Sequence, residues 1–450
     1  MNDLDVLLLN SPLFEESNQD YDGNVVPPLG LAYIASNLKD NSISCDLIDA
    51  VYEKMGVEDI CDYFQNTNPK FIGINIFTTN MELVKKIVEK CPIYTTFIIG
   101  GQAAKDLYNE IFAWKTQNKI IIIIGEADLL FSSLIRNIDD KIEPDKKYLN
   151  PPRELYKIEL TSIYFPNDIS KLKIHREFLK SEPIKNKFGY NEAFIIASRG
   201  CKYSCAFCAA ARNLNKNIPI RYRSAQSIKD EINEIKSLYN GNVDAIRILD
   251  DLFLRDNQSI MLAKEIFENS GLTWRSMAHT LSFKQTDINV LKELKKSGCT
   301  ELFIGVESGS ENMLKRINKF HNIPEIKKTF EKIFKAGINI KAYFIYGFPY
   351  EAIEDINDTY ELASSLRDIA KSYGTRFRAS AFKFRLYHGT KIYNDILKYN
   401  NNSIKIKMEH DNALSVPERS LFDFTSGNYS NVSDYCLTEF IEKTNRLKSN

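Results

Sequence analysis

The sequence has 450 residues, in which 59 Lys and Arg balance 59 Asp and Glu to a formal net charge of zero. This balance excludes a protein that binds nucleic acid or an anionic membrane through its overall field. The longest apolar run, residues 120–124, is far too short to cross a bilayer. An acidic start and eight scattered cysteines favour a cytoplasmic protein in a reducing compartment. The length suggests about two or three domains.

Residues 1–140 predict a Rossmann-like domain, because short apolar segments alternate with helical ones as in a doubly wound parallel sheet. We expect strands at residues 5–9, 44–49, 71–77, 96–100 and 119–125, and helices at 30–39, 57–65, 81–90 and 105–114. Such sheets bind ligands at the carboxyl ends of their strands. The candidate ligand-binding residues there are Pro28, Leu29, Thr78, Gly100, Gly101, Gln102, Gly125 and Glu126.

Two segments outside the main domains are less regular. Residues 141–190 are charged and punctuated by proline, without a long periodic segment, and they predict a linker. This linker is either ordered and strapped across the two domains or a plain spacer. Residues 396–450 form a polar C-terminal extension with an amphipathic piece at 435–447.

Residues 191–395 repeat strand and helix six times and predict a partial (β/α)6 barrel. The strands are expected to end at or near Ile196, Leu249, Met277, Val306, Tyr346 and Lys383, with helices at residues 227–239, 257–269, 288–297, 323–336 and 353–370. Six units cannot close an eight-stranded barrel, which leaves an open side for a large substrate. Functional side chains are expected at the carboxyl ends of these strands.

Three cysteines, Cys201, Cys205 and Cys208, follow the first barrel strand at CxxxCxxC spacing. A tetrahedral zinc site takes four protein ligands, and no fourth Cys or His lies nearby. A [4Fe-4S] cluster held by three cysteines instead leaves one iron open for a small molecule. The preceding Gly200 gives the backbone freedom to wrap a cluster, and Phe207 can shield it. The alternatives are a zinc site and buried free cysteines.

This motif resembles the signature of the radical S-adenosylmethionine (SAM) superfamily, CxxxCx-aromatic-C after the first strand of a partial barrel. The resemblance implies a [4Fe-4S] cluster whose open iron chelates SAM and cleaves it reductively to a 5'-deoxyadenosyl radical. It also implies an electron donor such as flavodoxin or ferredoxin, and a small-molecule or peptide substrate.

Further strand ends fit this family. Asp250 or Asp251 is expected to receive the SAM ammonium, although Asp at such a junction can simply cap the next helix. In GVESGS, Glu307 and Ser308 resemble the family residues that hold the ribose or amino-acid end of SAM. In FIYGFP, Tyr346 and Gly347 resemble the strand end that cradles the adenine.

The N-terminal stretches VVPPLGLAYIASNLK and FIIGGQ resemble the cobalamin-binding domain that precedes the barrel in one large class of the superfamily. No DxHxxG motif occurs, so no protein histidine is expected below the cobalt. GGQAA and GEADL replace the GGxH and GEGE of many relatives. The alternative is a Rossmann-like domain that serves for packing or substrate docking.

The resulting hypothesis is a cobalamin-dependent radical SAM methyltransferase that acts on an unactivated carbon in a natural product, peptide or cofactor precursor. One alternative is a radical SAM epimerase, cyclase or rearranging enzyme, with Cys436 or Cys299 as hydrogen donor. Another is a non-catalytic corrinoid or iron-sulfur sensor or carrier, which would not need the SAM-shaped strand ends. A methylthiotransferase is disfavoured, because the N-terminal cysteines lack its signatures.

Two residues are weak catalytic candidates. His388 stands where relatives commonly have proline, and it could act on substrate protons; a tolerated surface exchange is the preferred interpretation. The thiol of Cys436 could donate a hydrogen atom, and an inert half-buried cysteine is the preferred alternative.

Overall fold

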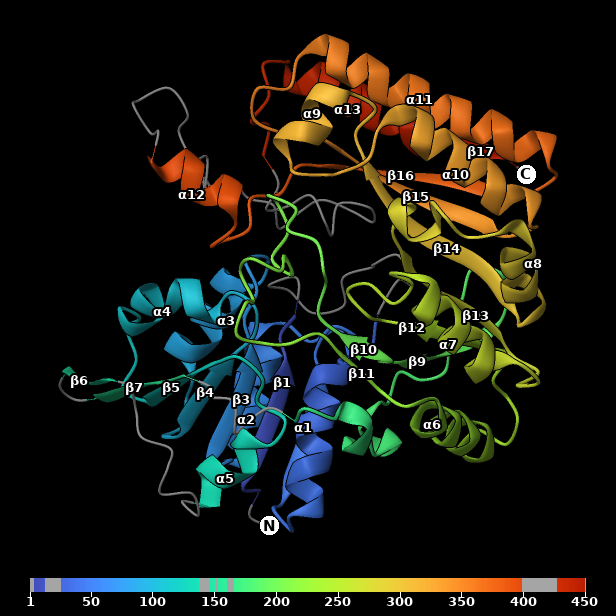
Figure 1. Ribbon diagram of the computed structural model, residues 1–450. Coiled ribbons are helices and arrows are strands. Elements are labelled where there is room, and N and C mark those ends of the chain that lie inside the picture. The colour runs from blue at the N-terminus through green and yellow to red at the C-terminus, as the bar shows by residue number, and fades with distance from the viewer. Residues whose placement is uncertain are drawn as a thin grey trace.

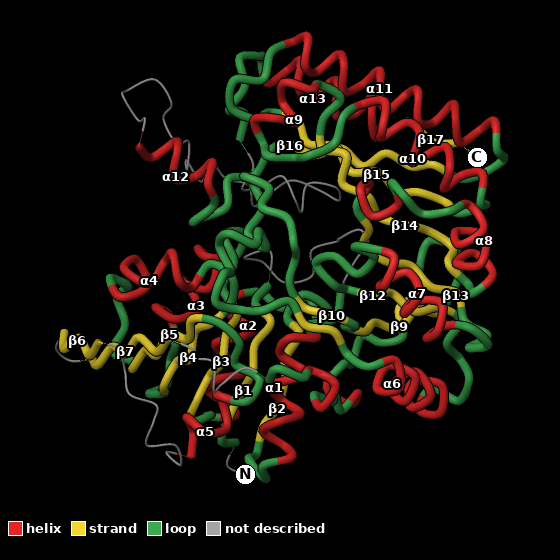
Figure 2. The backbone as a smooth tube through the Cα atoms, viewed as in Figure 1, coloured by secondary structure: helices red, strands yellow, loops and turns green. Residues whose placement is uncertain are grey.

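The computed structural model describes residues 4–12, 26–136, 146–150, 153–159, 166–398 and 427–449. Two mainly parallel sheets, one for each half of the chain, form two adjoining domains (Figure 1). Helices pack on the sheets in both domains (Figure 2). Within the described ranges, no helix combines the length and the apolar character that crossing a membrane needs.

The N-terminal sheet has the strand order β2-β1-β3-β4-β5-β7-β6. Strands β1 to β5 are parallel to one another, as the predicted doubly wound sheet requires. The predicted elements are confirmed, with bounds that agree to within two residues. They are β1 (Val6–Asn10), α1 (Leu29–Asp40), β2 (Cys45–Asp49), α2 (Val57–Thr67), β3 (Phe71–Asn75), α3 (Met81–Lys90), β4 (Thr96–Gly100), α4 (Ala104–Phe112) and β5 (Lys119–Ile124), followed by α5 (Leu130–Arg136).

Both faces of this sheet are covered because alternate side chains of each strand point to opposite faces. In β1, Leu7 and Leu9 join the core under α2, α3 and α4. Val6 and Leu8 join the opposite core under α1 and α5. The apolar part of β1, residues 6–9, is therefore buried on both faces, and the polar Asn10 lies at the carboxyl end of the strand.

The predicted linker is partly wrong. β6 (Lys146–Asn150) and β7 (Arg153–Glu159) form an antiparallel hairpin, and β7 extends the N-terminal sheet beside β5. Two short strands without an apolar alternation gave no clear periodic signal. The described residues 166–190 form an ordered strap: they contain the short helices η1 (Ile169–Lys171) and η2 (Arg176–Phe178), which contact α6 and α1 respectively.

The second sheet is the predicted partial barrel. Its six parallel strands are β9 (Asn191–Ile195), β12 (Ala245–Ile248), β13 (Thr273–Ala278), β14 (Cys299–Glu307), β15 (Asn339–Tyr346) and β16 (Phe377–Lys383). At the two edges of the sheet, β8 (Ile184–Lys185) pairs antiparallel with β9, and β17 (Lys448–Ser449) pairs antiparallel with β16. In the described chain β8 and β17 do not pair with each other, so the barrel is not closed. The helices are α6 (Ala225–Leu238), α7 (Asn257–Phe267), η3 (Thr280–Phe283), α8 (Ile288–Lys296), α9 (Glu311–Arg316), α10 (Ile323–Lys335), α11 (Ile353–Ser372), α12 (Lys391–Lys398) and α13 (Asp434–Asn445).

The barrel sheet has one sealed face and one accessible face. In β15, Ile340, Ala342 and Phe344 are buried in the core beneath the helices. The alternating Lys341 and Tyr343 point to the opposite, concave face and are only half-buried. Along β15, side chains of the concave face therefore alternate with side chains of the sealed core.

Candidate active site

The cysteine loop grows from the end of β9. β10 (Ser198–Arg199) pairs antiparallel with β11 (Arg221–Tyr222), so the chain between them is closed at its base. Within the loop, the Arg212 amide donates to the Tyr203 carbonyl at 2.7 Å, and the Cys208 amide donates to the Cys205 carbonyl at 3.2 Å. These bonds give the loop a defined shape without a ligand.

The three predicted cluster cysteines lie together and are partly buried. Burial raises the pKa of the thiols of Cys201 and Cys205, and it raises the pKa of Cys208 to about 12. In the described part of the chain, no three His, Cys, Asp or Glu side chains are close enough to hold one metal ion. Each cysteine of a [4Fe-4S] cluster binds a different iron, so its sulfurs stand farther apart than the ligands of a single ion. Three thiols from one loop, one for each of three irons, match the ligand set of a [4Fe-4S] cluster.

Asp250 and Asp251 have different surroundings. Asp250 is buried, accepts a hydrogen bond from the Ala197 amide at 2.8 Å and also bonds the Ser198 hydroxyl. Burial raises its pKa to about 6. Asp250 therefore fixes the strand that leads into the cysteine loop. Asp251 is exposed on the wall of the interdomain cavity described below, which Asp250 also lines, so Asp251 is the more accessible of the two candidates for the predicted ammonium contact.

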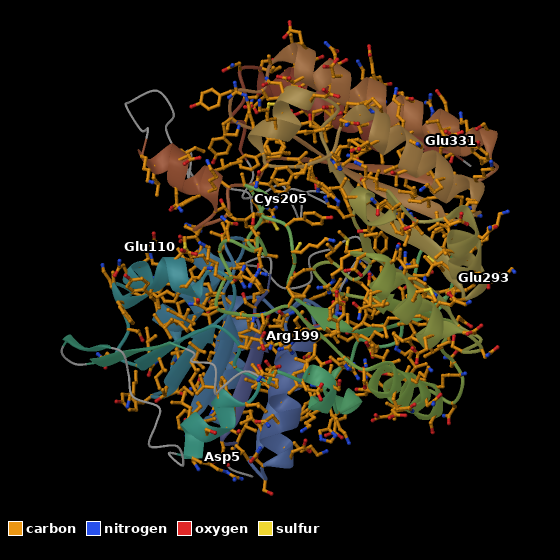
Figure 3. The ribbon with its side chains drawn as sticks, in the orientation of Figure 1. Asp5, Glu110, Arg199, Cys205, Glu293 and Glu331 are labelled. Carbon is orange, nitrogen blue, oxygen red and sulfur yellow. The ribbon has the colours of Figure 1, made fainter. Side chains whose placement is uncertain are left out.

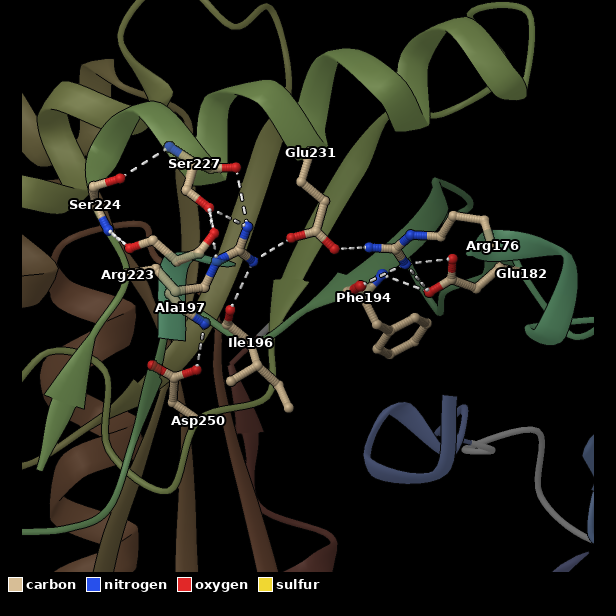
Figure 4. Close-up of polar contacts among 11 residues, drawn as sticks. Arg176, Glu182, Phe194, Ile196, Ala197, Arg223, Ser224, Ser227, Glu231 and Asp250 are labelled. Atoms are coloured by element: carbon tan, nitrogen blue, oxygen red, sulfur yellow. Dashed lines mark hydrogen bonds and ion pairs between the residues drawn. The ribbon is translucent and has the colours of Figure 1, made fainter. Parts of the chain in front are cut away.

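A buried charge network holds the same strand from its other side (Figure 4). Arg223 donates to the Ile196 carbonyl at 3.0 Å and pairs with Glu231. Glu231 also pairs with Arg176, which donates to the Phe194 carbonyl at 2.9 Å. Ionic bonds to otherwise unpaired backbone groups keep the end of β9 rigid where the cluster loop begins.

Glu307 ends β14, as predicted, and lies near Cys205 of the cysteine loop. It sits at a bulge of β14 with φ of 70°, and Lys319 Nζ lies 2.8 Å from its Oε1 atom. Lys319 in turn is near the thiol of Cys205 and lowers its pKa, against the larger effect of burial. Glu307 and Lys319 therefore form a buried ion pair close to the cysteine loop.

The side chains of Ser308 and Tyr346, for which SAM binding is predicted, bond to neighbouring helices. The Ser308 hydroxyl lies 3.0 Å from Thr359 Oγ1 on α11, and the Tyr346 hydroxyl lies 2.8 Å from Thr444 Oγ1 on α13. Both therefore face the outer helices. Gly347 has φ of 93° and donates its amide to Glu351, which places its backbone at the predicted strand end.

Phe207, predicted to shield the cluster, has an aromatic neighbour. Its ring packs edge-on against Phe348, which follows β15, with ring centroids 5.6 Å apart. The contact joins the cysteine loop to the end of the fifth parallel strand.

A cavity of about 580 Å³ lies between the carboxyl edge of the N-terminal sheet and the cysteine loop. Six predicted residues line it: Pro28, Gly100, Gly101, Gln102, Gly125 and Glu126. Leu29 does not, since it is buried in the core under α1, and Thr78 instead bonds His388. The barrel contributes the opposite wall, which includes Arg199, Cys201, Ile220 and Asp251, and this wall was missed because nothing local in the sequence pairs the two domains.

The lining fits a large, amide-rimmed corrinoid. A Cβ atom at Gly30 would meet no atom within 4 Å, so the helix start leaves open space there. Asn75 has a buried amide oxygen without a hydrogen-bond partner in the described chain, and it can accept from a ligand amide. Among the described lining residues there is no histidine, in agreement with the missing DxHxxG motif.

Ion pairs connect the two walls of the cavity. Both terminal nitrogens of Arg199 lie 2.8 Å from the carboxylate oxygens of Asp128, and Nη1 is 3.1 Å from Glu126 Oε2. Arg221 Nη1 lies 2.9 Å from the same Glu126 oxygen. Figure 3 shows Arg199 where the domains adjoin. Glu126, predicted to contact the cofactor, is thus neutralised in the wall.

The two weak catalytic candidates have different surroundings. His388 is buried, not on the surface as preferred above, and its Nδ1 atom lies 3.0 Å from Thr78 Oγ1. Burial lowers its pKa to about 4, so the ring is neutral at pH 7. Cys436 is in the first turn of α13, which packs against β16 and α11. Cys299 is buried at the amino end of β14, opposite the cluster end, which argues against a hydrogen-donor role.

Known proteins share both domains. The family described as B12 binding domain matches residues 21–135, and the Radical SAM superfamily matches residues 195–363. The uncharacterized methyltransferase PH0819 of Pyrococcus horikoshii is 26% identical over 80% of this chain and 78% of that protein. Cytidylyl-2-hydroxyethylphosphonate methyltransferase of Streptomyces wedmorensis is 22% identical over 75% of this chain and 73% of that protein.

Solved structures have the same fold. The cobalamin-dependent SAM radical enzyme OxsB superposes with a TM-score of 0.64 at 16% identity, over 88% of this chain and 60% of OxsB. The radical SAM methyltransferase TsrM from Kitasatospora setae, with cobalamin and a [4Fe-4S] cluster bound, gives a TM-score of 0.60 at 15% identity, over 88% of this chain and 75% of TsrM.

The chain therefore belongs to the radical SAM superfamily, in the class with an N-terminal cobalamin-binding domain. As a radical SAM enzyme it uses a [4Fe-4S] cluster and SAM and requires a reductant, and its first domain is a cobalamin-binding domain.

Proposed function

We propose that this enzyme methylates an unactivated carbon of a natural product, a peptide or a cofactor precursor in a cobalamin-dependent reaction. The observation that carries the proposal is the cavity between the domains. Its lining joins the glycine-rich strand ends of the N-terminal sheet to Cys201 and Asp251 beside the cluster loop. A corrinoid in this cavity would face the same space as SAM.

The protein's own residues would bind and orient the cofactors. Cys201, Cys205 and Cys208 would hold the cluster, and Asp251 with the Glu307–Lys319 pair would orient SAM. The glycine edge would hold cobalamin without a protein ligand to cobalt. When bound, the cluster with SAM supplies one-electron cleavage of the sulfonium, and cobalamin supplies the methyl group. We propose flavodoxin or ferredoxin as the electron donor.

Anaerobic reconstitution tests this function. The protein is loaded with iron, sulfide and hydroxocobalamin, desalted, and examined by ultraviolet-visible spectroscopy; it is then reduced with SAM present, and products are measured by mass spectrometry. We expect a corrinoid band that survives desalting, and formation of both 5'-deoxyadenosine and S-adenosylhomocysteine. Retained corrinoid with 5'-deoxyadenosine alone, under turnover with substrate, would instead indicate a rearranging or cyclising enzyme.

A further inference from the structure

Buried charges line the floor of the partial barrel and balance one another. Arg275 Nε lies 2.8 Å from Glu192 Oε1, and its Nη1 lies 3.2 Å from Glu301 Oε2. Arg378 donates twice to Glu301, at 2.8 Å each. Two guanidinium groups and two carboxylates satisfy each other here, so this network needs no ligand.

Arg247 lies beside this network on β12 without such compensation. Among the residues that the structure describes, its guanidinium has no hydrogen-bonding or ion-pair partner, and its Nε atom is buried. It lies 5.1 Å from the ring centroid of Phe303 and 5.9 Å from that of Phe194. An arginine stays charged at neutral pH, so within the described part of the barrel this cation has no directly bonded anion, although Glu192 and Glu301 lie near it.

Aromatic side chains lie near the Arg247 guanidinium on the concave face of the sheet. Phe303 and Tyr343 have ring centroids 6.4 Å apart, and Tyr343 stacks on Phe382 at 5.9 Å. Tyr343, Phe382 and Arg247 are each partly exposed on the concave face. The acidic side chains nearby, Glu192 and Glu301, are already bound to Arg275 and Arg378. One unpaired cation on apolar walls is suited to a ligand with an anionic group and an apolar body.

We propose that the substrate carries an oxyanion group, a carboxylate or a phosphate, and that Arg247 binds it inside the partial barrel. The inference rests on the proposed function, because it names the substrate class for that site. Arg247 lies on β12, and Asp250 follows two residues after the end of that strand, so extended chain between them spans roughly 10 Å. Binding the oxyanion at Arg247 would therefore place the reacting carbon several bonds away, toward the cluster loop.

Ligand-observed fluorine NMR can test this without turnover. The probes are 4-fluorobenzoate, 4-fluorophenyl phosphate and the neutral 4-fluorobenzamide, added to holoenzyme that retains its cluster and cobalamin. We expect both anions to bind more tightly than the amide. In Arg247→Gln, anion binding should weaken about ten- to a hundredfold, as for loss of a charge-assisted contact. The two anionic probes distinguish a carboxylate site from a phosphate site.

Two further variants complete the test. Arg247→Lys keeps the charge and should keep part of the anion affinity, which separates charge from folding. Arg446→Gln removes an exposed arginine at the end of α13 and should leave binding unchanged. Equal binding of anions by wild type and Arg247→Gln, or no preference for anions over the amide, would overturn the inference. Probe binding requires neither SAM cleavage nor methyl transfer, so the proposed function stands or fails separately.

Discussion

The carboxyl edges of the two parallel sheets carry different chemistry. The N-terminal edge presents glycines and backbone at Gly100, Gly101 and Gly125, and its acidic Glu126 is neutralised by arginines from the barrel. The barrel edge presents thiols and carboxylates, with Cys201 and Asp251 facing the same cavity. One edge can therefore hold a large ligand by shape, while the other orients small charged cofactors by specific bonds.

Loss of one cluster ligand should abolish cluster binding and SAM cleavage at the barrel edge. Cys205→Ala removes one of three thiolates, and we expect loss of the cluster absorbance and of 5'-deoxyadenosine formation, measured by iron analysis and mass spectrometry. Corrinoid retention should persist, since the glycine edge is untouched. The matched Cys436→Ala should keep both cluster and 5'-deoxyadenosine. Undiminished 5'-deoxyadenosine from Cys205→Ala would contradict the cluster assignment.

The connection between the edges is tested by Asp128→Ala, which leaves Arg199 without its bidentate partner. Removing one member of a buried pair costs about 3–5 kcal/mol, so we expect a lower melting temperature and faster proteolysis between the domains. Burial alone would raise the pKa of Asp128, but Arg199 lowers it and the net shift is downward. The stabilisation is therefore present above the ordinary carboxyl pKa and lost as pH falls through the depressed one.

The control for that variant is Asp62→Ala, which removes an exposed carboxylate of α2. It should leave both melting temperature and proteolysis unchanged. Equal stability of the Asp128 and Asp62 variants would show that the ion pairs do not hold the domains together.

Glu351 gives a further test of the comparison between the two sheet edges. It is an acidic residue at the barrel edge whose carboxyl group stays largely protonated in the folded protein. It is fully buried, accepts from the Gly347 amide, and burial raises its pKa to about 8. The unfolded chain ionises it at lower pH, so its contribution to stability falls as pH rises from about 4.5 through 8. Between pH 5.5 and 8.5, ionisation of Glu351 should lower the free energy of unfolding of the wild type by about 2–4 kcal/mol. Glu351→Gln should abolish this decrease, which urea denaturation at each pH measures.

The exposed Glu354→Gln on α11 is the control and should keep the pH dependence of wild type. An unchanged pH slope in Glu351→Gln would show that this carboxyl group titrates normally in the folded protein.

A smaller effect is expected at the N-terminal edge. Gly101 has φ of 108°, and a Cβ atom there would lie 2.6 Å from the Ile76 carbonyl oxygen. Gly101→Ala should cost about 1–3 kcal/mol and weaken corrinoid retention, measured by thermal melting and by absorbance after desalting. Gly30→Ala adds a methyl group where no atom lies within 4 Å and should not lower the melting temperature. A Gly101→Ala melting temperature equal to that of wild type would contradict the requirement for glycine.

The fold was largely predictable from sequence, because buried strands and amphipathic helices have distinct periods. The thiol motif and the glycine pairs were also visible, since their spacing is local. Side-chain direction at the barrel edge was not. Ser308 follows a register shift between Gly305 and Glu307, and a one-residue shift turns the following side chains to the other face.

Other residues needed knowledge of the concave face. Tyr346 lies one position after Ile345, whose parity points inward, so its side chain points to the helices. Arg247 stands between buried Ile246 and Ile248, and a charged residue in an apolar strand is a signal that could have marked it. The partners of Glu126 and Thr78 lie 95 and 310 positions away, beyond any local pattern.

The position of Arg199 has a mechanical consequence. This residue anchors the barrel to Asp128 of the first domain and precedes Cys201 by only two positions. Two residues have few rotatable backbone bonds, so a displacement of the first domain would also displace the cysteine ligands. Arg199, together with Arg221 on Glu126, therefore sets the spacing between the carboxyl edge of the first domain and the cysteine loop.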